Sequence, residues 1–179
     1  GAASIIIPLG KAPEFIAIGD IVIDAFIKLQ DAHETVNKET QNTELCMVFG
    51  TKLPFEFAEE VVAVGNSANA AVSASRLGLK AALVTNLGQD QQGESSLKKL
   101  QSENVDTKFI SMQEGKKTNY HYVLWYEADR TILVKHEEFS YKLPEIGSPK
   151  WLYLSSLGPT TLDYHMQIAE YLKSHPEVA

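Results

Sequence analysis

Apolar and polar positions form alternating blocks along this chain, and the blocks predict short strands and helices in turn. The stretch 14–29 is rich in Ile, Val and Phe, which favour strands, and Gly19 and Asp20 interrupt it like a bend. We expect two strands there, or one kinked strand. The polar stretch 31–43 has neither a helical nor a strand period, which predicts a surface connection that could be disordered.

Two segments that follow, 44–49 and 59–64, have the composition of short strands. They flank the turn-like segment 50–54. We therefore expect 44–64 to form a hairpin or flap.

Helical periodicity starts at Asn66, and Gly78 is typical of the position just beyond a helix C-terminus. The residues that share one face of this helix are Ala68, Ala71, Val72 and Ser75. This face of small residues would let the helix lie close to a sheet, or let a ligand approach its backbone.

Two more helices are expected, over 91–104 and 160–174. In the second, four apolar residues share one face: Leu162, Met166, Ala169 and Leu172. Apolar strands are predicted at 81–85, 107–112, 118–126, 131–136 and 151–154. The last of them is apolar enough to be a buried strand.

The order of these elements predicts an α/β protein, in which crossover helices cover a parallel sheet. The β-rich stretch 107–136 interrupts the alternation, which then resumes. The sequence ends just after a predicted helix, where such a sheet normally adds its next parallel strand. We therefore expect an incomplete α/β unit.

Composition narrows the class of protein. With 179 residues, of which 44% are apolar, the chain is long enough to bury a core. A formal net charge of −7 argues against nucleic acid and membrane surfaces as partners. The single cysteine, Cys46, excludes an internal disulfide and favours a reducing, cytoplasmic location. Residues 1–13 resemble a tag or linker remnant and receive no function.

Asp20 and Asp24 stand four residues apart in an apolar stretch, so in an extended chain their side chains point to the same side. Burying a carboxylate without a partner is costly. We therefore expect these acids at a sheet edge or in a cleft, where they hold a ligand. The structural alternative, which stays open, is that they cap the end of a strand.

The segment 64–69, Val-Gly-Asn-Ser-Ala-Asn, leads into the first predicted helix. Its backbone N–H groups and amide side chains can bind a polyhydroxylated ligand. Ordinary N-capping by Asn66 or Ser67 would explain one of these residues. It would hardly explain Asn69, which lies inside the helix, where Asn is a poor helix former.

Other candidate chemistry has simpler explanations. The loop 88–93 could cradle a phosphate, but a turn with Asp90 as helix N-cap explains it better. The five histidines lack the spacing of a metal site, so no metal ligand is predicted. The sequence contains no Walker, dinucleotide-binding or hydrolase-elbow motif, which argues against an oxidoreductase with an unusual loop.

Three segments together resemble the N-terminal half of ribokinase-like (PfkB-type) carbohydrate kinases. They are GDIVIDAFIKL at 19–29, the block at 64–106, and TNYHYVLWYEADRTI at 118–132. The family pattern has a glycine pair, an asparagine four residues on, a helix ending Arg-Leu-Gly, and a Gly-x-Asp-x-x-Gly turn. Here the pattern is Gly65, Asn69, Arg76-Leu77-Gly78 and Gly88-Gln89-Asp90-Gln91-Gln92-Gly93.

The resemblance implies a three-layer α/β/α ribokinase-like unit, incomplete and corresponding to the N-terminal part, with a small β-sheet lid. The implied core comprises 14–43, 65–117 and 137–179, and the implied lid comprises 44–64 and 118–136. A lid of this kind covers the sugar and often pairs between subunits, so a homodimer through the lid is expected.

The resemblance also implies a substrate site. Asp24 matches the aspartate that holds substrate hydroxyls, while Gly65, Asn66 and Asn69 match the substrate-binding glycine–asparagine block. Together with Asp20, these are the predicted substrate-binding residues. Val64 departs from the family, which usually has the first glycine of the pair there.

The second family signature, Asp-Thr-x-Gly-Ala-Gly-Asp, carries the catalytic base and the phosphoryl anion hole, and it is absent from this sequence. No catalytic residue is therefore predicted. The implied function is the substrate-binding portion of an ATP-dependent kinase that phosphorylates a hydroxymethyl group of a sugar or nucleoside. ATP and Mg²⁺ belong to the full-length enzyme, and this chain alone is expected to bind neither well and to be inactive. The alternative is a noncatalytic sugar-binding or dimerisation module of the same fold.

Overall fold

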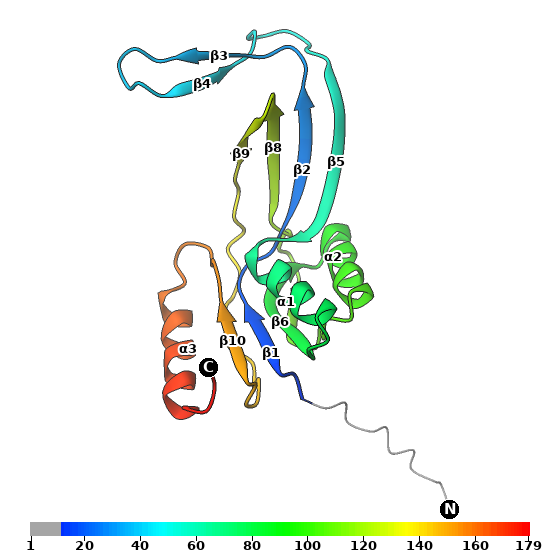
Figure 1. The fold of residues 1–179 in the computed structure, drawn as a ribbon, viewed down its shortest axis with the longest axis vertical. Helices are drawn as coiled ribbons and strands as arrows, with labels where there is room; N and C mark the ends of the chain where they lie inside the picture. Colours follow the sequence, from blue (N-terminus) through cyan, green and yellow to red (C-terminus); the bar gives the residue numbers. More distant parts are fainter. Residues whose placement is uncertain (1–11) are drawn as a thin grey trace, which may run out of the picture.

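The computed structural model of the protein describes residues 12–179 (Figure 1). The interpretation of 1–13 as a tag or linker remnant falls, up to residue 11, outside the described residues. The helices are α1 (Asn66–Arg76), α2 (Gln91–Ser102) and α3 (Leu162–Ser174). The strands are β1 (Phe15–Ile18), β2 (Val22–Leu29), β3 (His33–Val36), β4 (Thr43–Cys46), β5 (Phe55–Val64), β6 (Ala81–Gly88), β7 (Ile110–Gln113), β8 (Tyr120–Tyr126), β9 (Asp129–Leu133) and β10 (Trp151–Leu154).

A parallel sheet of order β10-β1-β6-β7 forms the centre of the α/β core. Side chains alternate between its faces along each strand. Ala17 and Leu83 pack on the side of α1 and α2, whereas Ile16 and Val84 pack on the side of α3. Figure 1 shows these helices on opposite sides of the sheet. The predicted three-layer α/β/α core is confirmed.

A second sheet, of order β5-β2-β8-β9, extends away from the core, and the hairpin β3–β4 lies at its far end (Figure 1). We call these two sheets together the lid. Strand β2 is a central strand of the lid, although the sequence analysis assigned the whole of 14–43 to the core. Asp24 therefore stands on a lid strand.

The hairpin predicted between 44–49 and 59–64 is wrong. Strand β4 pairs with β3, where His33 lies opposite Cys46, and β5 pairs with β2 instead. The reason is a turn within the polar segment 31–43: the Asn37 side chain accepts hydrogen bonds from the backbone N–H groups of Glu39 and Thr40, at 3.0 and 3.2 Å. An Asx turn of this kind closes a local hairpin without an apolar pattern.

The prediction that 151–154 is a buried strand is also wrong, and α3 packs through a different face from the one that carries its four apolar residues. Strand β10 is an edge strand with exposed aromatic side chains, and Leu162 and Met166 are 73% and 62% exposed. Helix α3 packs on the sheet through Tyr164 and Ile168, which are buried. The helix carries two apolar stripes, and periodicity alone does not determine which stripe faces the sheet.

Helix α2 begins as predicted, with Asp90 as its N-cap. The Asp90 carboxylate accepts hydrogen bonds from the Gly93 N–H at 2.8 Å and from the Thr118 N–H and hydroxyl at 2.9 and 2.6 Å. This acid therefore fixes the loop 88–93 to the base of β8. Across residues 12–179, every helix is too short or too polar to span a bilayer.

Candidate functional site

A cavity of about 290 Å³ lies where the core meets the lid. Its core side is formed by residues just beyond the ends of β1 and β10 and by the start of α1, and its lid side by residues of β2, β8 and β9. In open α/β sheets, ligands bind beyond the carboxyl ends of parallel strands. The cavity therefore has the location of a ligand site.

Four of the five predicted site residues line this cavity, namely Asp20, Asp24, Gly65 and Asn66. The fifth, Asn69, is exposed, lies one turn further along α1, and is not among the lining residues. The fold thus brings the two acids together with the start of α1.

The Asp20 carboxylate binds other parts of the protein. Its Oδ2 accepts a hydrogen bond from the Gly158 N–H at 2.6 Å, and both oxygens accept from the Tyr141 hydroxyl. Burial raises the pKa of Asp20, although these hydrogen bonds and the nearby His136 oppose the shift. Asp20 therefore holds the loop after β10 against the end of β1, a structural role at the wall of the cavity.

The Asp24 carboxylate, by contrast, is available to a ligand. Its Oδ1 is buried and has no hydrogen-bond partner within residues 12–179, and the Nδ1 of His121 lies 3.6 Å away from it. Burial raises the pKa of Asp24, while the charges of His121 and Arg130 oppose the shift. A carboxylate oxygen that has no partner in the protein can accept a hydrogen bond from a ligand hydroxyl.

The start of α1 presents backbone N–H groups rather than a capping side chain. Gly65 occupies the N-cap position with φ 111° and ψ 162°, and no side chain caps the helix, so N-capping by Asn66 or Ser67 is excluded. The Ser67 hydroxyl instead donates to the Asp20 carbonyl at 3.4 Å. The unused N–H groups of a helix start can bind anions or the oxygen atoms of polar ligands.

The sequence analysis did not select Asn119, His121 or His136, polar residues that also line the cavity. Asn119 is buried and bridges the Ile21 carbonyl and the Glu137 N–H, at 3.3 and 2.8 Å. The histidines were considered only as metal ligands. No local spacing could reveal them, because the parallel pairing of β2 with β8 is what places His121 opposite Asp24.

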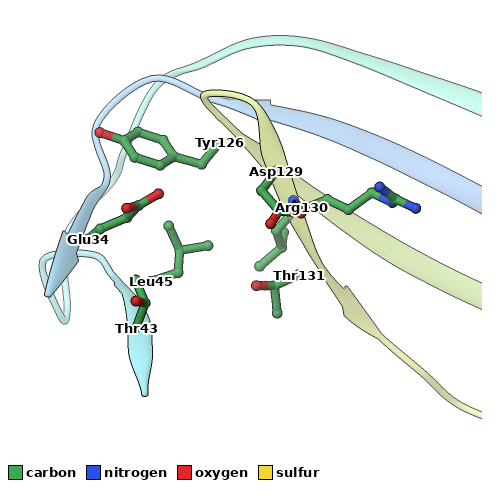
Figure 2. Close-up of a pocket in the computed structure, with 8 residues that line it drawn as sticks. Glu34, Thr43, Leu45, Tyr126, Asp129, Arg130 and Thr131 are labelled. Carbon is green, nitrogen blue, oxygen red and sulfur yellow. Dashed lines mark hydrogen bonds between the residues drawn. The ribbon is translucent and has the colours of Figure 1, made fainter. Parts of the chain in front are cut away.

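Two further cavities lie on the lid. One shares Asp24 and Ile132 with the first cavity and continues along the same face of the lid toward Trp125 and Arg130. The other lies between the hairpins β3–β4 and β8–β9, is lined by Leu45 and Thr131 from opposite sides, and contains none of the predicted site residues (Figure 2). Figure 2 shows the Arg130 side chain pointing away from the cavity between the two hairpins.

A metal site, and a phosphate site at the start of α2, find little support among residues 12–179. Residues 12–179 contain no group of three or more His, Cys, Asp or Glu side chains suited to a metal ion. At the start of α2 the Asp90 carboxylate already occupies the place where an anion would bind. An added Cβ at Gly88 or Gly93 would collide with backbone, which explains both glycines by packing alone.

The sequence matches known proteins in agreement with this geometry. Residues 56–176 match the family model described as pfkB family carbohydrate kinase. The sugar kinase PH1459 of Pyrococcus horikoshii, itself uncharacterized, is 34% identical over 87 residues. This match covers 49% of the present chain and 28% of the P. horikoshii protein.

Solved structures share the fold. Arabidopsis thaliana ribokinase, in complex with ribose and ATP, has a TM-score of 0.67 at 18% identity, covering 91% of this chain and 51% of that one. PH1459 in complex with ATP has a TM-score of 0.62 at 24% identity, covering 90% and 50%. The Methanocaldococcus jannaschii nucleoside kinase has a TM-score of 0.64 at 12% identity, covering 89% and 49%.

The chain therefore spans about half the length of these solved structures, and 28% of the curated relative. The structural neighbours show a common fold, and the family match takes in most of the sequence from β5 to α3. From this match and this fold we conclude that the chain belongs to the pfkB family of carbohydrate kinases.

Proposed function

We propose that this protein is the substrate-binding portion of an ATP-dependent kinase that phosphorylates a hydroxymethyl group of a sugar or nucleoside. The observation that carries the proposal is the cavity between core and lid, in which Asp24 keeps a buried carboxylate oxygen without a hydrogen-bond partner. Buried polar atoms are ordinarily paired, so a ligand group is the natural partner for this oxygen.

In this proposal the residues of the chain bind and orient the substrate. Asp24 accepts hydrogen bonds from substrate hydroxyls, and the start of α1 at Gly65 and Asn66 contacts the substrate on the core side. The lid excludes water and holds the acceptor hydroxyl in position, which contributes to phosphoryl transfer by proximity. ATP, with Mg²⁺, supplies the phosphoryl group, and we assign no catalytic residue to this chain.

We further propose that the chain alone has negligible kinase activity and binds ATP and Mg²⁺ weakly. The start of α2 supports this, because the Asp90 carboxylate would repel a phosphate there. The alternative is a noncatalytic sugar-binding or dimerisation module of the same fold. Both proposals predict that the chain itself binds sugar without turning over ATP. A kinase of about twice this length that contains the present sequence would favour the kinase proposal over the noncatalytic module.

The exposed apolar side chains of the lid support a homodimer that pairs through it. Phe55, Phe57, Trp125 and Ile132 are all more than a third exposed. Exposed large apolar side chains on one part of a protein are typical of interaction sites. The single free cysteine, Cys46, is compatible with a cytoplasmic location for such an enzyme.

Isothermal titration calorimetry with D-ribose, D-fructose, D-glucose and adenosine tests the proposal. We expect one of these compounds to bind the wild-type chain, and Asp24→Asn to weaken that binding at least 10-fold. Asp31→Asn, at an exposed position beyond β2, is the matched control and should bind like the wild type. If no compound binds, or if Asp24→Asn binds as tightly as the wild type, the proposal is wrong.

A further inference from the structure

We propose that His121 is a substrate-positioning residue, and that one ligand hydroxyl binds between its Nε2 and the Oδ1 of Asp24. The lid strand β8 would then recognise the substrate directly. This inference rests on the proposed function, because it assumes a polyhydroxylated ligand in the cavity. It adds a second recognition group, supplied by a different strand from that of Asp24.

The pairing of two lid strands brings these side chains together. Strands β2 and β8 are parallel neighbours, and Asp24 and His121 occupy the same register position. The side chains are 24% and 15% exposed, and the distance from His121 Nδ1 to Asp24 Oδ1 is 3.6 Å. This distance is too long for a hydrogen bond, so the pair leaves the hydrogen-bonding capacity of both groups unused.

Each residue buries a polar atom that has no partner. Within the described part of the chain, His121 Nε2 and Asp24 Oδ1 are both buried and make no hydrogen bond. Leaving a buried donor or acceptor unpaired costs about 1–3 kcal/mol. Because both residues line the same cavity, a single ligand group there can satisfy both atoms.

The protonation states of His121 and Asp24 determine which chemical group of a ligand can bind between them. Burial lowers the pKa of His121, and the neighbouring His136, whose ring lies 5.6 Å away, acts in the same direction, while the Asp24 carboxylate opposes them. The imidazole is therefore mainly neutral at pH 7. In this proposal the ligand-bound ring carries its proton on Nε2 and donates from that atom, whereas the Asp24 carboxylate only accepts.

A hydroxyl group fits between a donor and an acceptor, because it accepts from one and donates to the other. An ammonium group can only donate, and so cannot accept from Nε2–H. A methylene group can do neither, which leaves both buried atoms unpaired. Sites built to bind a hydroxyl reject analogues that lack it far more strongly than apolar pockets reject a missing methylene.

Calorimetry on the wild-type chain, His121→Gln and His121→Phe tests the inference, using whichever of D-ribose, D-fructose, D-glucose and adenosine binds the wild type. Each monodeoxy derivative of that compound is titrated as well. We expect one derivative to bind the wild type about 100-fold more weakly. His121→Phe should weaken binding of the parent compound to a similar degree, while binding that one derivative as well as the wild type does.

His121→Gln keeps an N–H donor and should recover part of the affinity lost in His121→Phe. His33→Gln, at an exposed position on the distant strand β3, is the matched control and should bind like the wild type. The melting temperature of each variant shows whether it is folded. The imidazole NMR signals of His121, assigned by their loss in His121→Gln, should shift when the compound binds.

The outcomes separate the two proposals. If the wild type binds a compound and His121→Phe, still folded, binds it equally tightly, the inference about His121 is overturned and the proposed function stands. Retained selectivity against the same deoxy derivative in His121→Phe would overturn it as well. If no compound binds the wild type, the proposed function fails, and this inference fails with it.

Discussion

The Tyr141 hydroxyl donates to both oxygens of the Asp20 carboxylate, at 2.7 and 3.0 Å, although the residues are 121 positions apart. Burial and the neighbouring Asp20 charge raise the pKa of Tyr141, so it remains a donor over the whole accessible pH range. The contact attaches the segment before β10 to the end of β1. It also places the Tyr141 ring beside that of Tyr164 in α3, in a tilted arrangement with ring centroids 5.3 Å apart.

Tyr141→Phe should therefore destabilise the core. The variant removes a hydrogen bond to a buried carboxylate, and we expect the free energy of unfolding to fall by about 1–3 kcal/mol. Urea denaturation measures this change. Tyr153→Phe is the control, because Tyr153 lies half-exposed on β10 and its hydroxyl makes no hydrogen bond within residues 12–179. An equal effect in both variants would contradict the role assigned to Tyr141.

Asp90→Ala should lower the free energy of unfolding by more than Tyr141→Phe does. The substitution removes the N-cap of α2 and also leaves the buried Thr118 without its carboxylate partner. The two losses together predict a decrease of about 2–4 kcal/mol in the free energy of unfolding. Asp31→Ala, at an exposed position, should change it by less than about 0.5 kcal/mol. A fall of less than 1 kcal/mol in Asp90→Ala would show that other groups hold the loop.

Gly88→Ala should disrupt the junction between β6 and the segment before β8. A Cβ at Gly88 would lie 2.5 Å from both the Lys116 carbonyl oxygen and the Thr118 nitrogen, which are backbone atoms that cannot move independently. We expect a loss of about 3 kcal/mol or more. Gly115→Ala is the control: Gly115 has φ +72° but open space around it, so the cost should be about 1 kcal/mol. Thermal unfolding measures both variants. A larger loss in Gly88→Ala than in Gly115→Ala would show the cost of the collision, because Gly115→Ala reports on backbone strain alone.

Glu103 should give the protein an acid-dependent contribution to stability. Hydrogen bonds from Arg76 and Lys99 lower the pKa of Glu103 from 4.5 to about 2. Because the folded pKa lies below the unfolded value, the stabilisation is present above pH 4.5 and is lost as the pH falls from 4.5 toward 2. Glu103→Gln should therefore flatten the pH dependence of the melting temperature in that interval.

The control for this measurement is Glu114→Gln, an exposed position that makes no ion pair among the described residues. It should retain the wild-type slope between pH 4.5 and pH 2. Since all three charged groups of the network lie at the surface, high salt should reduce the contribution of Glu103 as well. An unchanged slope in Glu103→Gln would mean that other carboxylates govern the acid transition.

Helix α3 has two apolar faces, and two substitutions distinguish which of them packs against the sheet. Ile168→Ala should lower the free energy of unfolding by about 2–4 kcal/mol, because Ile168 is fully buried against the sheet. Met166→Ala should lower it by less than about 1 kcal/mol, because Met166 is largely exposed. Denaturant unfolding of the two variants measures the difference. The opposite order would support the face predicted from periodicity.

Local sequence determined most of the elements and their types. Short apolar runs formed β1, β2 and β6, and Asp90 capped α2 where a turn residue precedes a helical period. These features depend on neighbours within a few residues, so the chain alone specifies them. The α/β class followed from their order, and the family pattern identified three of the residues that line the cavity, namely Asp24, Gly65 and Asn66.

Tertiary structure decided which elements pair and which faces are covered. Strand β5 pairs with β2 rather than β4, and α3 turns Ile168 rather than Met166 toward the sheet, because each choice is made by contacts with distant segments. The same holds for His121, which lies opposite Asp24 only through the parallel register of β2 and β8. Sequence spacing shows which residues share a face of one helix or strand. A binding site, however, is assembled from several helices and strands. Their relative register is fixed only when the whole chain packs.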